Sequence, residues 1–270
     1  GSNQAVGAAR LGAEVYFAGI IGDDKLGEIA TDLYKQESVN TQYLKKSSQR
    51  ATGAGFIILN EAGENGIILD MGANELVDEN FVNDVESQIA RSDIVMSVLE
   101  LPVAAAARAM NLGKKHGVRT ILNPAPALPL PDEMWQTIDL LTPNETELRI
   151  LLGLAPDDPT PTAELAAQLH ARGVSVLIVT RGGQGALIFD EEGPQEIPGV
   201  MVDVVDTTGA GAAFNAALAV ALAEGREVRS AVRFACCAGA IACTQLGVIP
   251  ALGNKKQVEA LHFGQSGLNP

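Results

Sequence analysis

The chain has 270 residues, 47% of them hydrophobic, which is enough for one sizeable α/β core rather than two small domains. Its 19 Lys and Arg residues are outnumbered by 33 Asp and Glu residues, and the formal net charge of −14 argues against a nucleic-acid or anionic-membrane surface. No apolar run reaches the roughly 18 residues of a membrane span and no secretory leader pattern opens the sequence, so we expect a cytoplasmic protein.

Two segments in the first quarter of the chain predict a small accessory sheet. Residues 56–59 and 66–70 are β-rich runs joined by a polar, glycine-containing turn, which is typical of a hairpin. Together with residues 15–22 they predict lid elements near 15–22 and 52–72 that stand off the main sheet. Such a sheet could cover a cleft or form a dimer edge. Because its exposed edges need to be covered, we expect a homodimer through the lid sheet.

From about residue 93, strand and helix patterns alternate. Strands are expected over residues 93–99, 119–123, 139–144 and 175–180, and helices over 102–117, from 145 onward, and over 162–173. This alternation predicts a mostly parallel sheet covered by helices on both faces. Ligands of such sheets bind beyond the carboxyl ends of the strands. The polar residues that follow the predicted strands are Glu100, Asn123, Asn144, Thr180 and Asp206.

Residues 204–225, VVDTTGAGAAFNAALAVALAEG, have the pattern of an anion-binding turn that opens a helix. We expect a strand over residues 202–205, a turn over 206–211 and a helix that ends at Gly225. Gly209 and Gly211 allow a tight turn and a close approach of the backbone to a ligand, while the first free N–H groups of the helix favour an anion. The same pattern also occurs in α/β proteins that bind nothing at this turn.

The string DTTGAG, followed by Ala212, Ala213, Phe214 and Asn215, closely resembles the carboxyl-terminal signature of the ribokinase (PfkB) family of carbohydrate kinases. Further similar motifs cover nearly the whole chain: residues 1–15, GENGIILDMGAN at 63–74, LELP at 99–102, LNPAPA at 122–127, TPNETE at 142–147 and TRGGQG at 180–185. The resemblance implies one domain over residues 1–270, with a three-layer α/β/α sandwich, a mostly parallel sheet and a small β lid.

The resemblance also implies the chemistry, which is transfer of the γ-phosphoryl group of ATP to a sugar hydroxyl. The LNPAPA motif favours the 5-hydroxyl of D-ribose. Another pentose, a ketohexose or a nucleoside remains an alternative substrate within the family. Asn3 and Glu100 match sugar-contacting residues, and the amides of Ala210, Gly211 and Ala212 would hold the phosphoryl oxygens.

Cofactor residues are implied in the same way. Those matching nucleotide contacts are Asn144, Thr180, Arg181, Gly182, Gly183, Gln184, Gly185, Gly211 and Cys236, the last in the place of a family asparagine. Glu147 matches the residue that places Mg²⁺ through water, as suits a hydrated cation. Those matching ligands of a monovalent cation such as K⁺ are Asp206 and Thr208, with Ala242, Gln245, Gly247 and Ala251 around them. Ala251 replaces a hydroxyl residue of the family.

The clearest departure from the family is Ala212, which stands where the catalytic aspartate is expected. Alanine accepts no proton, and a positioned general base contributes roughly 10² to 10⁴-fold in rate, so we expect very poor turnover. A deliberate substitution and a natural pseudokinase both explain this residue. A non-catalytic protein that binds sugar or nucleotide is the alternative function.

A second departure lies at the start of the chain, because Gly1 falls inside the family's first glycine motif. The family's first strand, with its sugar-binding aspartate, and part of the flap are therefore expected to be missing. Either the sequence omits a segment or the fold has lost part of its sugar site. In both cases unpaired strand edges and an apolar gap are expected.

Overall fold

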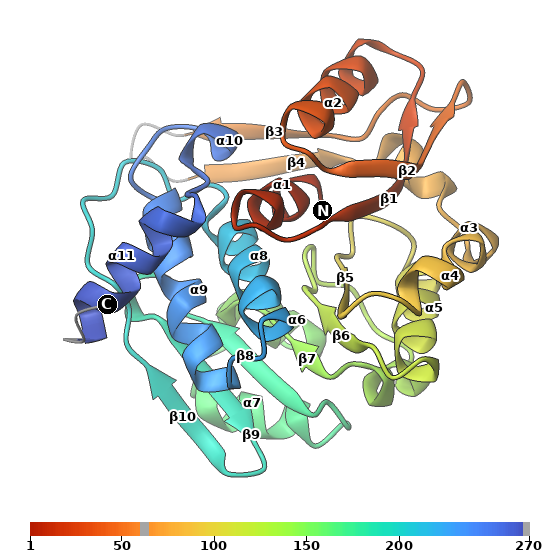
Figure 1. Ribbon diagram of the computed structural model, residues 1–270. Coiled ribbons are helices and arrows are strands. Elements are labelled where there is room, and N and C mark those ends of the chain that lie inside the picture. Colours follow the sequence, from red (N-terminus) through yellow and green to blue (C-terminus); the bar gives the residue numbers. More distant parts are fainter. Residues whose placement is uncertain (60–64, 267–270) are drawn as a thin grey trace.

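The main sheet of the computed structural model, which describes residues 1–59 and 65–266, has six strands in the order β10-β9-β8-β7-β6-β5 (Figure 1). Their bounds are β5 Ile94–Ser97, β6 Arg119–Leu122, β7 Leu140–Leu141, β8 Val176–Thr180, β9 Ala186–Asp190 and β10 Gly193–Ile197. Strands β5 to β8 are parallel, as the alternating pattern predicted. The antiparallel hairpin β9–β10, which the sequence analysis did not identify, extends the sheet beyond β8.

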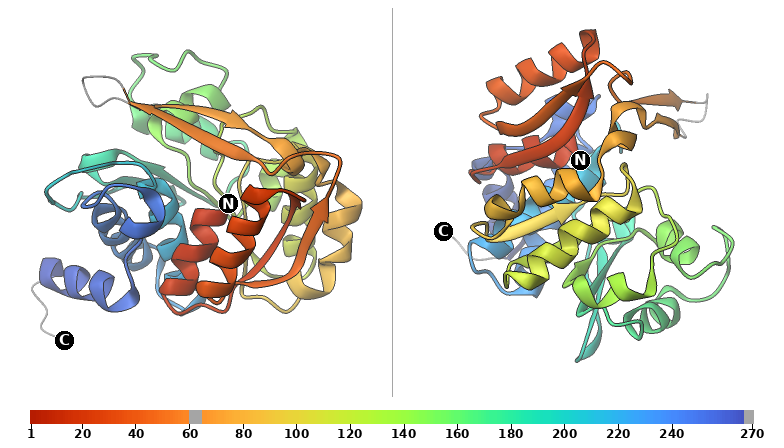
Figure 2. Two further views of the ribbon diagram at one scale, coloured as in Figure 1. Left: turned by 90° about the horizontal axis from the view of Figure 1, so that it is seen from above. Right: turned by 90° about the vertical axis from the view of Figure 1, so that its right-hand side faces the viewer.

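Helices cover both faces of this sheet and give three layers (Figure 1, Figure 2). One face packs against α1 Ser2–Arg10, α8 Ala210–Ala223 and α9 Val228–Ala242, with α10 Val248–Ala251 and α11 Lys255–Ser266 beside them. The other face packs against α5 Val103–Lys115, α6 Glu145–Leu151, α7 Thr162–His170 and the 3₁₀ turn η2 Asp132–Thr137. The short helices α3 Glu79–Asp84 and α4 Glu86–Ile89 lie against α5.

Neighbouring residues of the strands alternate between the two helical layers, which explains why the strands are almost wholly apolar. Ile121 and Leu140 belong to the core cluster that contains α8 and α9. Their neighbours Leu122 and Leu141 belong to the cluster that contains α5, α6 and α7. Since side chains of a strand point alternately to its two faces, a strand buried on both faces reads as a continuous apolar run.

Two small sheets lie apart from the main one. Strands β1 Tyr16–Gly22 and β2 Asn40–Ser47 are parallel and are covered by α2 Lys25–Gln36. Strands β3 Ala54–Leu59 and β4 Asn65–Asp70 form an antiparallel hairpin, followed by the 3₁₀ turn η1 Gly72–Leu76. The turn expected between β3 and β4 falls on residues 60–64, which lie outside the described residues.

The expectation of one accessory sheet built from residues 15–22 and 52–72 is therefore wrong in its pairing. β1 pairs with β2, whereas the hairpin pairs with no other strand in the described part of the chain. Strand β2 was not predicted, because its residues NTQYLKKS are mostly polar and only partly buried. Strand β1 instead contacts η1 at the base of the hairpin, so the two small sheets are neighbours without sharing strands.

A cavity of about 1140 Å³ lies between β1 and β5. Its lining includes Phe17 and Ile20 of β1 and Ile94 and Met96 of β5, with apolar residues of α1 and α8. The edges of β1 and β5 that face it pair with no strand of the described ranges. Within the described residues, the cavity therefore has unpaired strand backbone on two sides and a lining of both apolar and polar side chains.

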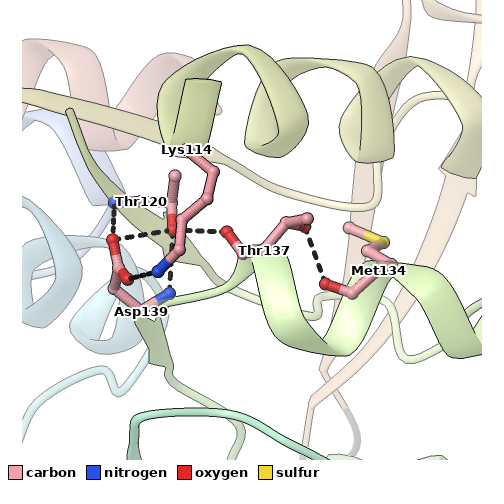
Figure 3. Close-up of polar contacts among 5 residues, drawn as sticks. All are labelled: Lys114, Thr120, Met134, Thr137 and Asp139. Atoms are coloured by element: carbon pink, nitrogen blue, oxygen red, sulfur yellow. Dashed lines mark hydrogen bonds and ion pairs between the residues drawn. The ribbon is translucent and has the colours of Figure 1, made fainter. Parts of the chain in front are cut away.

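A buried threonine fixes β6 against β7 at the amino ends of these strands (Figure 3). The Thr120 hydroxyl donates to the Thr137 carbonyl at 2.7 Å and accepts from the Asp139 amide at 2.8 Å. The Thr120 amide donates to Asp139 Oδ2 at 3.0 Å, and Lys114 Nζ lies 2.8 Å from Asp139 Oδ1. These contacts provide hydrogen-bond partners for the backbone groups of Thr120, Thr137 and Asp139, where the pairing of β6 with β7 begins.

Thr120→Val should lower the free energy of unfolding by about 1 to 3 kcal/mol, because it leaves the half-buried Asp139 amide and Thr137 carbonyl without the hydroxyl that they contact. Urea unfolding measures this loss as a lower midpoint with an unchanged slope. Lys114→Met is the matched control, since it removes only a half-exposed ion pair, worth roughly 0 to 1 kcal/mol. Equal losses in the two variants would contradict the role given to the hydroxyl.

Candidate active site

Of the two glycines expected to allow a tight turn, Gly209 lies in the turn before α8, whereas Gly211 already belongs to the first turn of the helix. Gly209 caps the helix with φ of +88°, in the left-handed region that favours glycine. A Cβ at this position would lie 2.6 Å from Val248 Cγ1. At the other end of α8, Gly225 has φ of +82° and follows the last turn, as expected. Glycine is thus needed at both ends of α8.

Two backbone amides at the head of α8 are available to a ligand. The N–H groups of Gly211 and Ala212 have no backbone or side-chain acceptor among the described residues, and a Cβ added at Gly211 would meet open space. The amide of Ala210 donates to the Thr207 carbonyl at 3.3 Å, so the expected set of three amides is reduced to two. Free N–H groups at the positive end of a helix form an anion site.

The expected strand over residues 202–205 is absent from the structure, where this segment is an extended loop. Val204 and Val205 are each 62% exposed, and no strand of the main sheet lies beside them to pair with. The amides of Val205 and Asp206 instead donate to the Cys243 carbonyl at 2.8 and 3.2 Å. The end of α9, rather than the sheet, therefore positions the turn.

The carboxylate of Asp206 joins two loops at this end of the molecule. Its Oδ1 accepts from the Thr208 amide at 2.9 Å and its Oδ2 from the Gly247 amide at 3.0 Å. Hydrogen bonds from the side chain and amide of Thr208, and then from Gly247, lower the pKa of this carboxyl. The carboxylate is therefore the form that the two loops stabilise.

The other residues expected around a monovalent cation lie near this junction. Gln245 is in the same loop as Gly247, Ala242 ends α9, and Ala251 is buried at the end of α10. In the described part of the chain, no group of three or more His, Cys, Asp or Glu side chains is placed to hold a metal. A cation at this junction would thus depend on Asp206 and on backbone carbonyls.

A second helix start carries the pair Asn144 and Glu147. Asn144 Oδ1 accepts from the Glu147 amide and Glu147 Oε2 accepts from the Asn144 amide, both at 2.8 Å, which is a complete capping box. Burial raises the pKa of Glu147 to about 7, although the hydrogen bond from the Asn144 amide opposes the shift. No cationic side chain pairs with Glu147 in the described residues. A half-buried carboxylate without a protein counter-ion is chemically suited to a hydrated Mg²⁺.

The raised pKa of Glu147 makes the stability of the ligand-free protein depend on pH. Because its folded-state pKa of about 7 exceeds the ordinary value of 4.5, the group favours folding most below pH 4.5 and this contribution is lost as pH rises to 7. Glu147→Gln keeps an acceptor for the Asn144 amide without the charge. As pH increases from 4.5 to 7, the unfolding free energy of this variant should rise relative to that of the parent. Above pH 7 the difference should stay constant.

Urea unfolding between pH 4 and pH 8 measures this difference. Glu164→Gln is the matched control, because it makes the same charge change in the first turn of α7 at an exposed position. If the difference in unfolding free energy between Glu147→Gln and the parent stayed constant with pH, burial would not control the pKa of Glu147.

The turn after β8 lies next to this helix start. Thr180 bridges to Asn144, and its amide donates to the Pro143 carbonyl at 2.9 Å. The following 3₁₀ turn, η3 Gly182–Gln184, is closed by an N–H of Arg181 that donates to the Gly185 carbonyl at 2.8 Å. The structure thus brings the TRGGQG motif beside Asn144, as the pattern of strand ends predicted.

Individual residues of this turn differ in their surroundings. Gly185 has φ of +92°, and a Cβ there would collide with the Ile197 carbonyl oxygen. Gly182 and Gly183 face open space, so they leave room for a ligand. Arg181 Nη1 lies 3.2 Å from Glu196 Oε1, and its buried Nε has no partner in the described part of the chain.

Cys236 is a half-buried residue of α9, the helix that packs against α8. Burial, with a smaller contribution from Cys237, raises its pKa to about 12. It is therefore a neutral thiol at neutral pH and cannot act as a charged ligand.

Of the two residues expected to contact sugar, Glu100 follows β5 and lies beside the start of α1, the helix that carries Asn3. Glu100 also borders the large cavity, which does not extend to the glycine turn. The cavity therefore adjoins Glu100 and not the glycine turn before α8.

Thr142 and Asn215 connect the starts of α6 and α8. The sequence analysis assigned no role to either residue. The buried Thr142 donates its hydroxyl to the buried Asn215, which lies on α8. Asn215 is the polar residue in the otherwise apolar and buried stretch 213–222 of α8. A lone polar residue inside such a helix is the signal that could have identified it, because buried polar groups need partners.

Comparison with known proteins shows where this arrangement recurs. Residues 1–254 match the family described as pfkB family carbohydrate kinase. The ribokinase of Haemophilus influenzae is 38% identical over 263 residues, which cover 97% of this chain and 85% of the relative. The ribokinase of Bacillus subtilis is 36% identical over 261 residues, with coverage of 97% and 86%.

Solved structures agree with these relatives. The structure of Arabidopsis thaliana ribokinase complexed with ribose and ATP matches with a TM-score of 0.89 and 32% identity, covering 97% of this chain and 86% of that one. The ribokinase of Thermotoga maritima matches with a TM-score of 0.86 and 31% identity, over the same shares of the two chains. The likeness extends over the sheet and both helical layers.

Proposed function

This chain belongs to the pfkB family of carbohydrate kinases, and from that premise we propose that its reaction is transfer of the γ-phosphoryl group of ATP to the 5-hydroxyl of D-ribose. The observation that carries the proposal is the pair of amides of Gly211 and Ala212, which have no acceptor among the described residues, at a helix start that faces open space. Relatives named ribokinase at 36 to 38% identity support ribose as the sugar.

Each part of the site has a role in this reaction. The amides of Gly211 and Ala212 would stabilise the negative charge that develops on the transferring group, and amides fixed by a helix need no reorganisation to do so. Asn144 and the turn 180–185 would hold the remaining phosphates and the nucleoside. Glu147 would orient a hydrated Mg²⁺, which supplies positive charge to the phosphates when bound. Asn3 and Glu100 would orient the sugar by hydrogen bonds to its hydroxyls.

Ala212 makes this chain a poor catalyst in the proposal. Its side chain lies in the first turn of α8, where a carboxylate would receive the proton of the attacking hydroxyl. Without that group the hydroxyl must lose its proton to water. A protein that binds sugar and nucleotide without turning them over is the second candidate function, and Ala212 is the observation that favours it.

The substrate is tested by titration calorimetry of this chain with ribose, fructose, adenosine and pseudouridine in the presence of MgADP. We expect ribose to bind most tightly. Tighter binding of a nucleoside would replace ribose as the substrate. ADP formation that requires K⁺ would support the junction at Asp206 as the monovalent-cation site.

We also propose a cytoplasmic homodimer, formed through the β3–β4 hairpin. The hairpin exposes apolar side chains, with Phe56 and Ile68 each 59% accessible, and its outer edges are unpaired in the described residues. In the described part of the chain, each helix is too short or too polar to cross a bilayer. Phe56→Glu should shift the sedimentation coefficient to that of a monomer, whereas Met201→Glu, at an exposed position that is not part of the hairpin, should not. A parent chain that sediments as a monomer at micromolar concentration would rule out the dimer.

A further inference from the structure

A short hydrogen bond joins the end of β7 to the interior of α8. Thr142 and Asn215 are each 1% exposed. The Thr142 hydroxyl donates to Asn215 Oδ1 at 2.6 Å, and Asn215 Nδ2 donates to the Gly211 carbonyl at 2.9 Å. A buried asparagine side chain thus connects the end of a central strand with the first turn of the helix whose amides form the anion site.

The two ends of this connection lie close to the two parts of the site that must face the same phosphates. Thr142 comes two residues before Asn144, which caps α6. Gly211 carries one of the two free amides of α8. The hydrogen bond between Thr142 and Asn215 therefore connects the start of α6 with the start of α8.

Hydrogen bonds of Val205, Asp206 and Gly247 fix the loop before α8, and the Thr142–Asn215 bond is a direct side-chain link from the sheet to the first turns of the helix. The buried stretch 213–222 of α8 consists of small and aliphatic residues apart from Phe214 and Asn215, and Gly209 and Gly211 flank Ala210 at its start. Apolar contacts carry little directional preference, whereas a hydrogen bond has a preferred distance and angle. Burying two polar side chains inside an apolar layer is also costly unless they pair with each other.

The connection continues to the sugar side of the site. Asn123 Nδ2 donates to the Thr142 carbonyl at 3.1 Å, and Gln4 Nε2 donates to Asn123 Oδ1 at 2.9 Å. Gln4 is buried and adjoins Asn3 on α1. The side chains Gln4, Asn123, Thr142 and Asn215 therefore form a polar chain that crosses the carboxyl edge of the sheet.

We propose that Thr142 and Asn215 are positioning residues that hold the amides at the head of α8 in register with Asn144 and Glu147 at the head of α6, so that one set of nucleotide phosphates contacts both. This inference rests on the proposed function, because it concerns the same phosphates. It adds two residues that touch neither nucleotide nor sugar and that act through the position of Gly211.

The test is the affinity of the full chain for MgATP, measured by titration calorimetry, together with its melting temperature. Thr142→Val has nearly the same shape but no hydroxyl. It should weaken MgATP binding about tenfold, in the range found when residues that orient a ligating group are removed. Thr142→Ser keeps the hydroxyl and should bind within about twofold of the parent, since only a methyl group is lost.

Thr120→Val is the matched structural control. Thr120 is likewise buried and hydrogen-bonded, but it lies at the opposite, amino edge of the sheet (Figure 3). It should lower the melting temperature and leave MgATP affinity within about twofold, because no site residue depends on it. A loss of affinity equal to that of Thr142→Val would mean that destabilisation alone weakens binding, and would overturn the inference.

A double-variant cycle tests the direct connection. Asn215→Leu should weaken MgATP binding like Thr142→Val, and the double variant should be no weaker than the weaker of the two. Unchanged affinity in both single variants, or fully additive losses, would overturn the inference. Failure of the unsubstituted chain to bind MgATP would instead overturn the proposed function, so the two failures are distinct. If Thr142→Val does not fold, the MgATP affinities of Thr142→Ser and Asn215→Leu are compared instead. The inference then requires weaker binding in Asn215→Leu than in Thr142→Ser.

Discussion

Ala212→Asp should raise the rate of ribose-dependent ADP formation by roughly 10² to 10⁴-fold, the contribution of a positioned general base. The new carboxylate would stand in the first turn of α8, beside the free amide of Gly211, where the attacking hydroxyl must lose its proton. A coupled assay of ADP release in the presence of ribose, Mg²⁺ and K⁺ measures the change. The increase should fall on kcat, because the base acts in the transition state more than in binding.

Ala212→Asn is the control for this gain, since asparagine has the size of aspartate but accepts no proton at neutral pH. It should remain as slow as the parent. A gain of similar size in both variants would assign the effect to a hydrogen bond rather than to base catalysis. No gain in the aspartate variant would leave the non-catalytic binding protein as the better account of this chain.

Gly211→Val should abolish most MgATP binding, by about 100-fold or more, while the fold stays intact. A Cβ added at this position would meet open space, and helical Cβ atoms tilt toward the amino end of the helix, where the anion would lie. An added branched side chain would displace the phosphates from the amides, and misplacement by about 1 Å costs roughly 10²-fold. Calorimetry and urea unfolding together measure the two effects.

Gly209→Ala is expected to show the opposite behaviour. Its φ of +88° costs a residue with a Cβ about 1 to 2 kcal/mol, and that Cβ would also press on Val248. This variant should therefore lose stability, whereas Gly211→Val should change the unfolding free energy by less than about 1 kcal/mol. A stable Gly211→Val variant that binds MgATP like the parent would remove the anion site from the head of α8.

The sequence was sufficient to predict the features that depend on local patterns. The parallel strands β5 to β8, the helices between them and the left-handed glycines around α8 follow from apolar runs, helix periodicity and turn chemistry. The capping box of Asn144 and Glu147 is also local, because its two hydrogen bonds span three residues, although the sequence analysis named these residues only as expected ligand contacts. The resemblance of several motifs to one family then identified the family itself, which the comparisons confirmed.

The features that failed depend on contacts distant in the sequence. Residues 202–205 have a strand composition, but they form no strand in the described part of the chain, and the Val205 amide donates instead to the Cys243 carbonyl at the end of α9. Strand β2 is too polar and exposed to show a β pattern, so its parallel pairing with β1 was missed. The bond between Thr142 and Asn215 joins residues 73 positions apart. No local pattern can specify such a pair, although each member stands out as polar among apolar neighbours.

The most direct test of the central proposal is a crystal structure of this chain with ribose and MgATP, which Ala212 should preserve unreacted. The account predicts that oxygens of the terminal phosphate lie about 2.7 to 3.1 Å from the amide nitrogens of Gly211 and Ala212, with Glu147 on the side of the magnesium. A nucleotide whose phosphates bind away from the head of α8, with both amides still facing solvent, would contradict it.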